Sequence, residues 1–348
     1  MKYIGNKTRI MNFIEESLKK GNIDYNNKKV IDLFAGTGSV SSFFLRHGST
    51  VYSCDNMLYS ICEQYRVNYY REEPTFEELK DFLIDYSLDG VLKYLNSLSL
   101  IKGYFYENYA PSGKYKRKYF SDNNAMKIDA IRLEIEKWEE ILPQEKKLFL
   151  LGILMCAADK VSNTSGTYGA YLKIWRSMAL KDLVLEKPAF TSKGNNIIEL
   201  CDVLTCIKNH KDVDIIYMDP PYNKRQYASN FHVLENIVVF DKQDLKGKTG
   251  LRDYKNQKSD YCIKSKVKNA FEELVMNMET KYLVMSYSTE GLLSEKEILE
   301  VLNRRGVVSL YRHSYRRFKT NAWTDKDTNL QELLFICKFY SNGCNNKV

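Results

Sequence analysis

The sequence predicts an α/β fold built around a mostly parallel sheet of seven strands. Three observations support this prediction. Apolar, β-branched runs alternate with helical patterns along most of the chain. The first run leads through a glycine-rich turn into an apolar helix, and a later run stops abruptly at two prolines. A strand that leads through a glycine turn into a helix is the plan of nucleotide-binding sheets, and two prolines force a strand to stop.

Seven segments have the composition of strands. They are 30–34, 50–54, 196–200, 214–218, 282–286, 306–311 and 333–339. Apolar residues at three- and four-residue spacing predict helices at 10–18, 40–46, 231–240, 266–278 and 294–304. No convincing helical pattern separates the last two strands, so we expect them to form an antiparallel pair at one edge of the sheet.

The abrupt strand ending is Asp219-Pro220-Pro221-Tyr222. Two prolines cannot continue a strand ladder, so the chain must turn there. The turn presents a carboxylate, free backbone carbonyls and an aromatic ring, and this set suits a flat ligand that carries an amino group. Carboxylate and carbonyl would accept the N–H bonds while the ring stacks on the ligand's face. A turn that only closes a buried strand is the alternative interpretation.

The glycine-rich turn spans residues 34–38, with the sequence Phe-Ala-Gly-Thr-Gly. A strand, a glycine turn and a helix form the plan of nucleotide-binding sites, because glycine lets the ligand approach the backbone closely. Ser41 stands where a dinucleotide fingerprint has a third glycine or alanine, so a bound nucleoside is favoured over a pyrophosphate. Asp55 at the tip of the second strand is placed to accept both ribose hydroxyls of an adenosine-containing cofactor. Alternatively, Asp55 caps a helix that starts near Met57.

The pattern changes between residues 65 and 194. This region is rich in tyrosine, lysine and asparagine, and its clearest helical patterns lie at 128–141 and 144–160. Residues 162–173 are polar, aromatic and punctuated by glycine. We interpret the region as an inserted, mainly helical module whose loops contact something large and polar. An insertion that only decorates the fold is the alternative.

Charge and composition restrict the partners. The chain of 348 residues has a net charge of +8, with 44% hydrophobic and 28% charged residues, as in an ordinary globular protein. Basic residues cluster with aromatic ones at 114–118 and 312–319, which favours a polyanionic partner over a small anion. The alternative for each cluster is a solvated surface face.

The cysteines and the hydropathy pattern restrict the setting. The eight cysteines are scattered and form no C-x-x-C pair, which argues against a zinc site and a disulfide framework, so we expect no metal. No apolar run is long enough to span a bilayer, and the N-terminus lacks the apolar core of a signal peptide. We therefore expect a cytoplasmic protein.

Taken together, these motifs resemble a known family. The segments 3–7 (Tyr-Ile-Gly-Asn-Lys), 32–38 and 219–222 occur in this order around a long insert, with Asp55 at the second strand. Asn223 to Tyr227 and the closing Glu332-Leu333-Leu334 extend the similarity over most of the chain. The chain resembles the Dam-like adenine-specific (N6) DNA methyltransferases, which include type II modification methylases.

The resemblance implies a seven-stranded, Rossmann-like, S-adenosylmethionine-dependent methyltransferase fold with an antiparallel last strand. It implies a catalytic domain at 1–64 and 195–348 and an inserted DNA target-recognition domain at 65–194. The segment 3–7 would close over the methionine end of the cofactor, and Asp202 matches an acid near its adenine. The implied cofactor-binding residues are Tyr3, Lys7, Asp32, Phe34, Gly36, Gly38, Asp55, Asp202 and Asp219.

The implied reaction agrees with the chemistry of the proline turn. The exocyclic nitrogen of adenine is a poor nucleophile because its lone pair is delocalised into the ring. Accepting its N–H bonds at Asp219 and at the Pro220 carbonyl would aim the lone pair at the methyl donor, so catalysis comes from positioning and electrostatics. A base in a duplex must be flipped out to reach these groups and would stack on Tyr222. The predicted catalytic residues are therefore Asp219, Pro220, Pro221 and Tyr222.

The predicted DNA surface combines the basic clusters with the polar segment of the insert. Its candidate residues are Lys114, Lys116, Arg117, Lys118, Asn163, Tyr168, Lys173, Lys224, Arg225, Tyr227, Arg316 and Arg317. The expected partners are double-stranded DNA and a cognate restriction endonuclease, or DNA alone for a solitary enzyme. We expect a monomer or a weak dimer.

Parts of the pattern are compatible with other functions. Methylation of an RNA adenine or of a cytosine amino group uses the same turn, and a catalytically silent DNA-binding regulator could use the same fold. An NAD-dependent dehydrogenase leaves the proline turn and the basic clusters without a purpose. Methylation at cytosine carbon-5 needs a cysteine that conventionally follows proline, and none of the six prolines is followed by cysteine.

Overall fold

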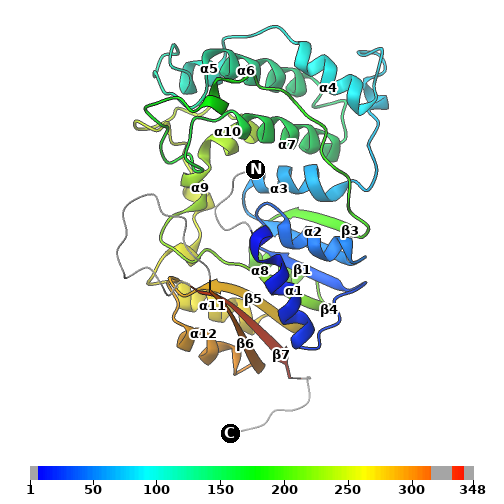
Figure 1. Cartoon of the computed structure of the whole chain (residues 1–348), viewed down its shortest axis with the longest axis vertical. Helices are drawn as coiled ribbons and strands as arrows, with labels where there is room; N and C mark the ends of the chain where they lie inside the picture. Colours follow the sequence, from blue (N-terminus) through cyan, green and yellow to red (C-terminus); the bar gives the residue numbers. More distant parts are fainter. Residues whose placement is uncertain (1–6, 315–330, 341–348) are drawn as a thin grey trace.

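The computed structural model describes residues 7–314 and 331–340 and contains a seven-stranded sheet (Figure 1). The strands are β1 Lys29–Leu33, β2 Thr50–Asp55, β3 Asn195–Leu200, β4 Val213–Met218, β5 Thr280–Ser288, β6 Gly306–Ser314 and β7 Gln331–Phe339. Their order is β3-β2-β1-β4-β5-β7-β6. The first five strands are parallel, and β7 pairs antiparallel with both β5 and β6. The predicted α/β fold, its seven strands and its antiparallel last pair are confirmed.

Helices cover both faces of the sheet. They are α1 Met11–Lys20, α2 Ser39–Arg46, α8 Val203–Asn209, α11 Val267–Met276 and α12 Glu295–Leu302, and a single 3-10 turn, η1 Lys7–Ile10, precedes α1. The alternation of side chains along β1 divides the core: Val30 packs with α1 and α2, whereas Ile31 and Leu33 pack with α8, α11 and α12. The helices predicted at 10–18, 40–46, 266–278 and 294–304 are confirmed, and α8 was not predicted.

A separate helical layer lies beyond the β3 edge, at the top of Figure 1. Its helices are α3 Leu58–Gln64, α4 Leu88–Ser97, α5 Tyr104–Tyr109, α6 Asp122–Lys137, α7 Gln144–Lys160, α9 Tyr227–Asn230 and α10 His232–Val239. Short helical turns lie in the connections around these helices. One is a π-helical turn, η2 Tyr65–Tyr69, and the others are 3-10 turns: η3 Glu77–Leu79, η4 Ser177–Leu180, η5 Lys255–Gln257 and η6 Asp260–Cys262. Within the described part of the chain, no helix is long and apolar enough to cross a membrane.

The helices of this layer share one hydrophobic core, which includes residues of α3 and α10 as well as residues of the predicted insert. The helix predicted at 128–141 begins earlier, at Asp122, because the Ser121 hydroxyl accepts the Asn124 N–H and caps its first turn. The helix predicted at 144–160 is confirmed, whereas α4 and α5 were not predicted. The insert boundaries at 65 and 194 stay a prediction, since α10 belongs to the same core.

One buried carboxylate joins two helices of this layer, α10 and α3. Glu235 of α10 accepts the backbone N–H groups of Leu58, at 3.2 Å, and Tyr59, at 2.9 Å. These N–H groups lie in the first turn of α3, where no earlier helical carbonyl can accept them. The carboxylate accepts their hydrogen bonds, and its negative charge interacts favourably with the positive end of the helix dipole. Gln257 also donates to Glu235, at 2.7 Å. The segment after β2, helix α10 and the loop around residue 257 are therefore fixed to one another.

Candidate active site

The site lies at the carboxyl ends of β1 and β4, where the strand order reverses. From β1 the chain proceeds outward through β2 and β3, and from β4 it proceeds outward on the other side. Ligands of doubly wound sheets bind in the crevice that this reversal leaves open. Phe34 follows β1 and Asp219 follows β4, and both residues line two adjoining cavities in the crevice.

The two cavities differ in size and chemistry. The larger has a volume of about 280 Å³, and its walls include Asp55, Met57, Asp202, Pro221 and Tyr227. The smaller has a volume of about 30 Å³ and is lined by the glycine-rich turn 34–37, Ser39, Asp32 and Lys7. Asp219, which stands at both, faces a roomy, largely apolar chamber on one side and a narrow polar one on the other.

Asp219 forms an ion pair with a lysine from the start of the chain. Lys7 Nζ lies 3.0 Å from Asp219 Oδ1 and 2.5 Å from Glu332 Oε1. All three side chains are largely buried, with exposed fractions of 8%, 19% and 7% for Lys7, Asp219 and Glu332. The Ser286 hydroxyl also donates to Glu332 Oε1, at 2.8 Å. One cation thus holds two carboxylates from β4 and β7 together.

Burial and charge shift the protonation of this cluster. Burial raises the pKa of Asp219 to about 6, against the opposing effect of the Lys7 charge, and the Glu332 charge adds to the rise. Burial alone lowers the pKa of Lys7, but the two carboxylates outweigh this effect and raise the pKa well above its usual range. Lys7 therefore remains a cation, and Asp219 changes its protonation near pH 6.

The glycine-rich turn has the left-handed backbone that glycine permits. The φ angles of Gly36 and Gly38 are 52° and 72°. A Cβ atom on Gly38 would lie 2.4 Å from Asn68 Nδ2 and 2.6 Å from Gln64 Oε1, so there is no space for a side chain. Phe34 also has a positive φ, 60°, which places a strained non-glycine residue at the rim of both cavities.

Three further acids predicted to hold cofactor also have structural partners. Asp55 accepts the N–H of Gly36 at 2.9 Å and the N–H of Met57 at 3.0 Å, so it fixes the glycine turn as well as lining the larger cavity. Asp202 caps α8 by accepting the N–H groups of Leu204 and Thr205. The buried Asp32 accepts the Ser41 hydroxyl at 2.5 Å and lines the smaller cavity. Burial raises the pKa of Asp32 to about 7.

These residues fit an adenosine cofactor that carries an amino acid. The glycine turn 34–37 lines the narrow cavity with Lys7 beside it, and a glycine backbone lets a ligand approach closely. Asp55 and Asp202 supply acceptors at the roomy cavity for ribose hydroxyls and an adenine amino group. The chain matches the family model of the D12 class N6 adenine-specific DNA methyltransferases over residues 3–301.

The chain belongs to this family. It is 37% identical to the type II methyltransferase M.NlaIII of Neisseria lactamica over 332 residues, which are 94% of this chain and 95% of that protein. It is 33% identical to the type II methyltransferase M.CviAII of Paramecium bursaria Chlorella virus 1, over 96% of this chain and 97% of that one. The modification methylase StsI of Streptococcus sanguinis is 34% identical, and there the match spans 96% of this chain but 51% of StsI.

The predicted family, the adenine-specific methyltransferase activity and the cofactor S-adenosylmethionine are confirmed by these matches. The substrate is double-stranded DNA. The magnesium protoporphyrin IX methyltransferase of Synechocystis PCC 6803, solved with bound SAM, is 8% identical, with a TM-score of 0.33 over 96% of this chain and 80% of that one.

Aromatic residues around the methyltransferase cavity are arranged differently from the prediction. Pro221, Tyr227 and Tyr261 line the larger cavity. Tyr222 is partly buried against the core on the α11 and α12 face, and its carbonyl accepts the Leu292 N–H at 2.9 Å. Tyr261 contacts the Phe34 ring edge-on, with centroids 4.9 Å apart. Tyr227, which we expected on the DNA surface, is therefore a wall of the cavity, and Tyr261 was not predicted.

Three residues predicted to contact DNA lie in the interior, and their prediction as surface residues was wrong. The buried guanidinium of Arg117 donates to the carbonyls of Asn108, Gly247 and Lys248. The buried amide of Asn163 donates to the Leu172 carbonyl, and the buried hydroxyl of Tyr168 donates to Asp159. These side chains hold loops together, because a buried polar group needs internal partners.

The other DNA-surface predictions divide into two groups. Lys114, Lys116, Lys173, Lys224 and Arg225 are exposed, and Lys118 is half-buried. Their contact with DNA stays a prediction. Arg316, Arg317 and the cofactor residue Tyr3 lie outside the described residues.

Two charged residues at the site had no predicted role. Glu332 was part of the motif that carried the family resemblance, but its pairing with Lys7 depends on β7 lying beside β5, which no local pattern reveals. Lys258 lines the larger cavity from the loop between η5 and η6. The only sequence signal for Lys258 is the density of lysine in the segment 242–268.

Proposed function

We propose that the larger cavity holds the adenosine half of the cofactor at its Asp55 and Asp202 side and receives a single adenine, flipped out of a specific DNA sequence, at its Asp219 and Tyr227 side, where Asp219 holds the amino group of that adenine during methylation. The observation that carries this proposal is the position of Asp219 at the rim shared by both cavities. An acceptor at this point can contact a base in the larger cavity and remain adjacent to the cofactor cradle. A base can reach it only after leaving the duplex stack.

The cofactor would be held along the crevice by residues of this chain. Lys7 and the backbone of the glycine turn would hold its methionine end, and Asp55 and Asp202 its adenosine end. When bound, S-adenosylmethionine supplies an electrophilic methyl group on its sulfonium. Asp32 is buried behind the glycine turn and accepts a hydrogen bond from the Ser41 hydroxyl, so its role would be to stabilise the turn.

Asp219 and the Pro220 carbonyl would accept the two N–H bonds of the adenine amino group. This withdraws the nitrogen lone pair from conjugation with the ring and directs it toward the methyl donor. Lys7 and Glu332 fix the Asp219 carboxylate at the end of β4, so little reorganisation is needed during transfer. After transfer the amino nitrogen carries a positive charge and loses a proton; ionised Asp219 is adjacent to receive it.

The base would be enclosed by aromatic side chains. Tyr227 and Tyr261 are placed to contact its faces or edge, and Pro221 forms the adjoining wall. Tyr222 follows Pro221 directly and would stack on the base after a change of side-chain rotamer. Stacking on aromatic rings offsets part of the cost of removing a base from the duplex.

The DNA surface would be formed by loops of the helical layer and the active-site turn. Arg117 ties residues 114–118 to the turn at 247–248, and the Tyr119 hydroxyl donates to the Tyr168 carbonyl at 2.7 Å. The Tyr168 N–H donates in turn to the Asn230 carbonyl at the end of α9. The exposed cations on these linked segments would contact phosphates, and the insert 65–194 would read bases.

The chain would act as a monomer, or as a weak dimer, in a restriction-modification pair with a cognate endonuclease. The relatives named as type II methyltransferases support this setting. One flipped adenine needs one active site. Sedimentation of the protein on a single duplex tests the stoichiometry.

The experiment that tests the function supplies labelled S-adenosylmethionine with duplex DNA, single-stranded DNA or RNA, then digests each product to nucleosides. We expect label in N6-methyladenine from duplex DNA and no other methylated nucleoside. Sequencing of methylated positions in a genome that expresses the protein then gives the recognition sequence. Label confined to RNA or to a cytosine amino group would overturn the proposal.

A further inference from the structure

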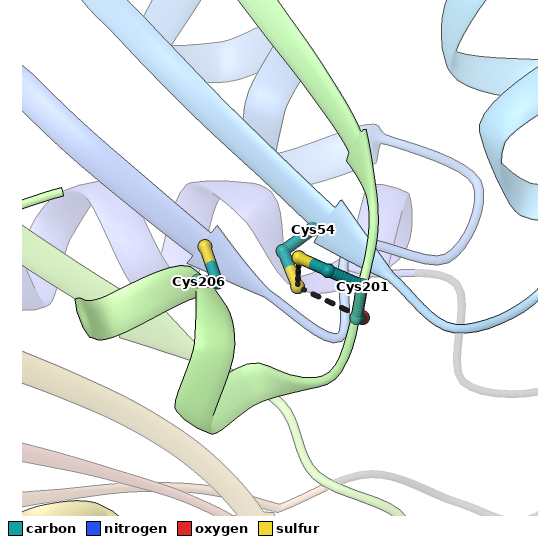
Figure 2. A group of neighbouring side chains, drawn as sticks. All are labelled: Cys54, Cys201 and Cys206. Atoms are coloured by element: carbon teal, nitrogen blue, oxygen red, sulfur yellow. Dashed lines mark hydrogen bonds between the residues drawn. The ribbon is translucent and has the colours of Figure 1, made fainter. Parts of the chain in front are cut away.

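Three cysteines that are distant in the sequence meet beside the cofactor cavity. Cys54 lies next to the last residue of strand β2, Cys201 directly follows β3, and Cys206 lies in α8. Their sulfur atoms all lie within 4.8 Å of one another. Figure 2 shows the three side chains converging from two strand ends and one helix. The absence of a C-x-x-C pair, which argued against a metal site, therefore does not exclude a site assembled by the fold.

The fold fixes these positions. The parallel register of β2 and β3 pairs Cys54 with Glu199 and Asp55 with Leu200, so Cys201 emerges at the same sheet edge. Asp202 then caps α8, and the first turn of that helix returns Cys206 toward the strand ends. Cys54 and Cys206 are fully buried, whereas Cys201 is half-buried and lines the larger cavity. A solute in the cavity can therefore reach the cluster through Cys201.

The distances suit a thiophilic metal ion. Cys54 Sγ lies 3.4 Å from Cys201 Sγ. Sulfur atoms bound to tetrahedral zinc, with Zn–S bonds of about 2.3 Å, are about 3.8 Å apart. Small side-chain movements would bring all three sulfurs onto one ion. Glu199 Oε2, 3.9 Å from Cys201 Sγ, is close enough to supply a fourth ligand, and a water molecule is the other candidate.

We propose that Cys54, Cys201 and Cys206 form a three-thiolate site for a soft divalent metal such as Zn²⁺ or Cd²⁺, and that the bound metal obstructs the cofactor cavity. On binding, each thiol exchanges its proton for a sulfur–metal bond, and the protons pass to solvent without any redox change. Cys201 adjoins Asp202 and Val203 in the wall of the larger cavity. An ion with its fourth ligand there competes with the adenosine half of S-adenosylmethionine.

Equilibrium titration tests the site. The protein, reduced with a phosphine and freed of metal, is titrated with Cd²⁺ while the ultraviolet cadmium–thiolate absorption is followed. We expect one ion per chain, and a loss of affinity of about tenfold or more in each of Cys54→Ser, Cys201→Ser and Cys206→Ser. The matched control is Cys156→Ser, since Cys156 lies in α7 of the helical layer and outside the cluster. Circular dichroism checks that every variant is folded, and Cys→Ala versions replace any that is not.

Cofactor binding tests the consequence. We expect stoichiometric Cd²⁺ or Zn²⁺ to weaken S-adenosylmethionine binding by the wild-type protein, and a chelator to restore it. Cys206→Ser should bind the cofactor normally, because Cys206 does not line the cavity. Since it lacks one of the three thiolates, its cofactor binding should no longer respond to the metal. Absence of one-to-one binding, or equal binding by the three variants and wild type, would overturn the site. Unchanged cofactor affinity in the metal-loaded protein would overturn the obstruction. The titration needs no turnover, so its result is separate from that of the methylation assay.

Discussion

Lys7 Nζ lies 3.0 Å from Asp219 Oδ1, which joins the start of the chain to the active-site turn across more than 200 residues of sequence. The same ammonium lies 2.5 Å from Glu332 Oε1 on β7. The two neighbours act on Asp219 in opposite directions: the Lys7 cation lowers its pKa and the Glu332 anion raises it. This opposition leads to a pair of predictions that a purely structural role for the cluster would not produce.

Methylation should decline as pH falls through about 6, because burial raises the pKa of Asp219 to about 6 and the protonated acid accepts hydrogen bonds poorly. We call this decline the acid limb of the pH–rate profile. Glu332→Gln removes an anion, so it lowers the pKa of Asp219 and moves the acid limb to lower pH. Lys7→Met removes a cation and moves the limb to higher pH. We expect displacements of about one pH unit in each direction.

The measurement is the pH dependence of single-turnover methyl transfer at saturating cofactor and DNA. Lys19→Met is the control, since Lys19 forms an exposed ion pair with Glu15 on α1, away from both cavities. Displacement of the limb in the same direction by both Lys7→Met and Glu332→Gln would refute the assigned electrostatics.

Gly38→Ala should impair both stability and cofactor binding. The left-handed φ of 72° costs a non-glycine residue about 1–2 kcal/mol, and the new Cβ would overlap Asn68 and Gln64. The matched control is Gly247→Ala, where φ is 68° but no atom lies within 4 Å of the added Cβ. Thermal unfolding and cofactor titration should show a larger stability loss for Gly38→Ala and a cofactor defect only there. Equal effects of the two substitutions would show that the close packing behind the turn is unimportant.

Arg117 and Lys116 are neighbours with different expected roles. Arg117→Gln should lower the free energy of unfolding by about 1–3 kcal/mol, because three carbonyls lose the donor that they share and the Asn108 bond among them is buried. Lys116→Gln should leave stability unchanged and weaken DNA binding with a smaller salt dependence, since Lys116 is exposed. Chemical denaturation and DNA titration at several salt concentrations separate the two roles. A destabilised Lys116→Gln or a fully stable Arg117→Gln would contradict the assignment.

The sequence predicted those parts of the site that depend on local chemistry. A proline pair ends β4, glycines permit the left-handed turn, and an acid at the tip of β2 lines the cavity, so the placement of Asp219, Gly36 and Asp55 at the cavities follows from neighbouring residues alone. Their roles in binding and catalysis stay predictions. The strands were found in the same way, because buried parallel strands are continuous apolar runs.

Other features depend on tertiary packing and have no local signature. Glu332 meets Lys7 because β7 inserts between β5 and β6, and the three cysteines meet because β2 and β3 end at one edge. Arg117 and Tyr168 resembled surface residues in composition, but a folded interior also needs polar side chains to satisfy buried carbonyls and loops.

The most direct test of the central claim compares wild type with Asp219→Asn in two measurements on the same samples: cofactor affinity by titration and methyl transfer in a single turnover. The amide keeps the size of the side chain but loses the negative charge and one of the two acceptor oxygens. We predict cofactor affinity within a few-fold of wild type and a methyl-transfer rate lower by about 10²–10³-fold. Wild-type transfer by Asp219→Asn would contradict the assignment of Asp219 as the acceptor of the adenine amino group.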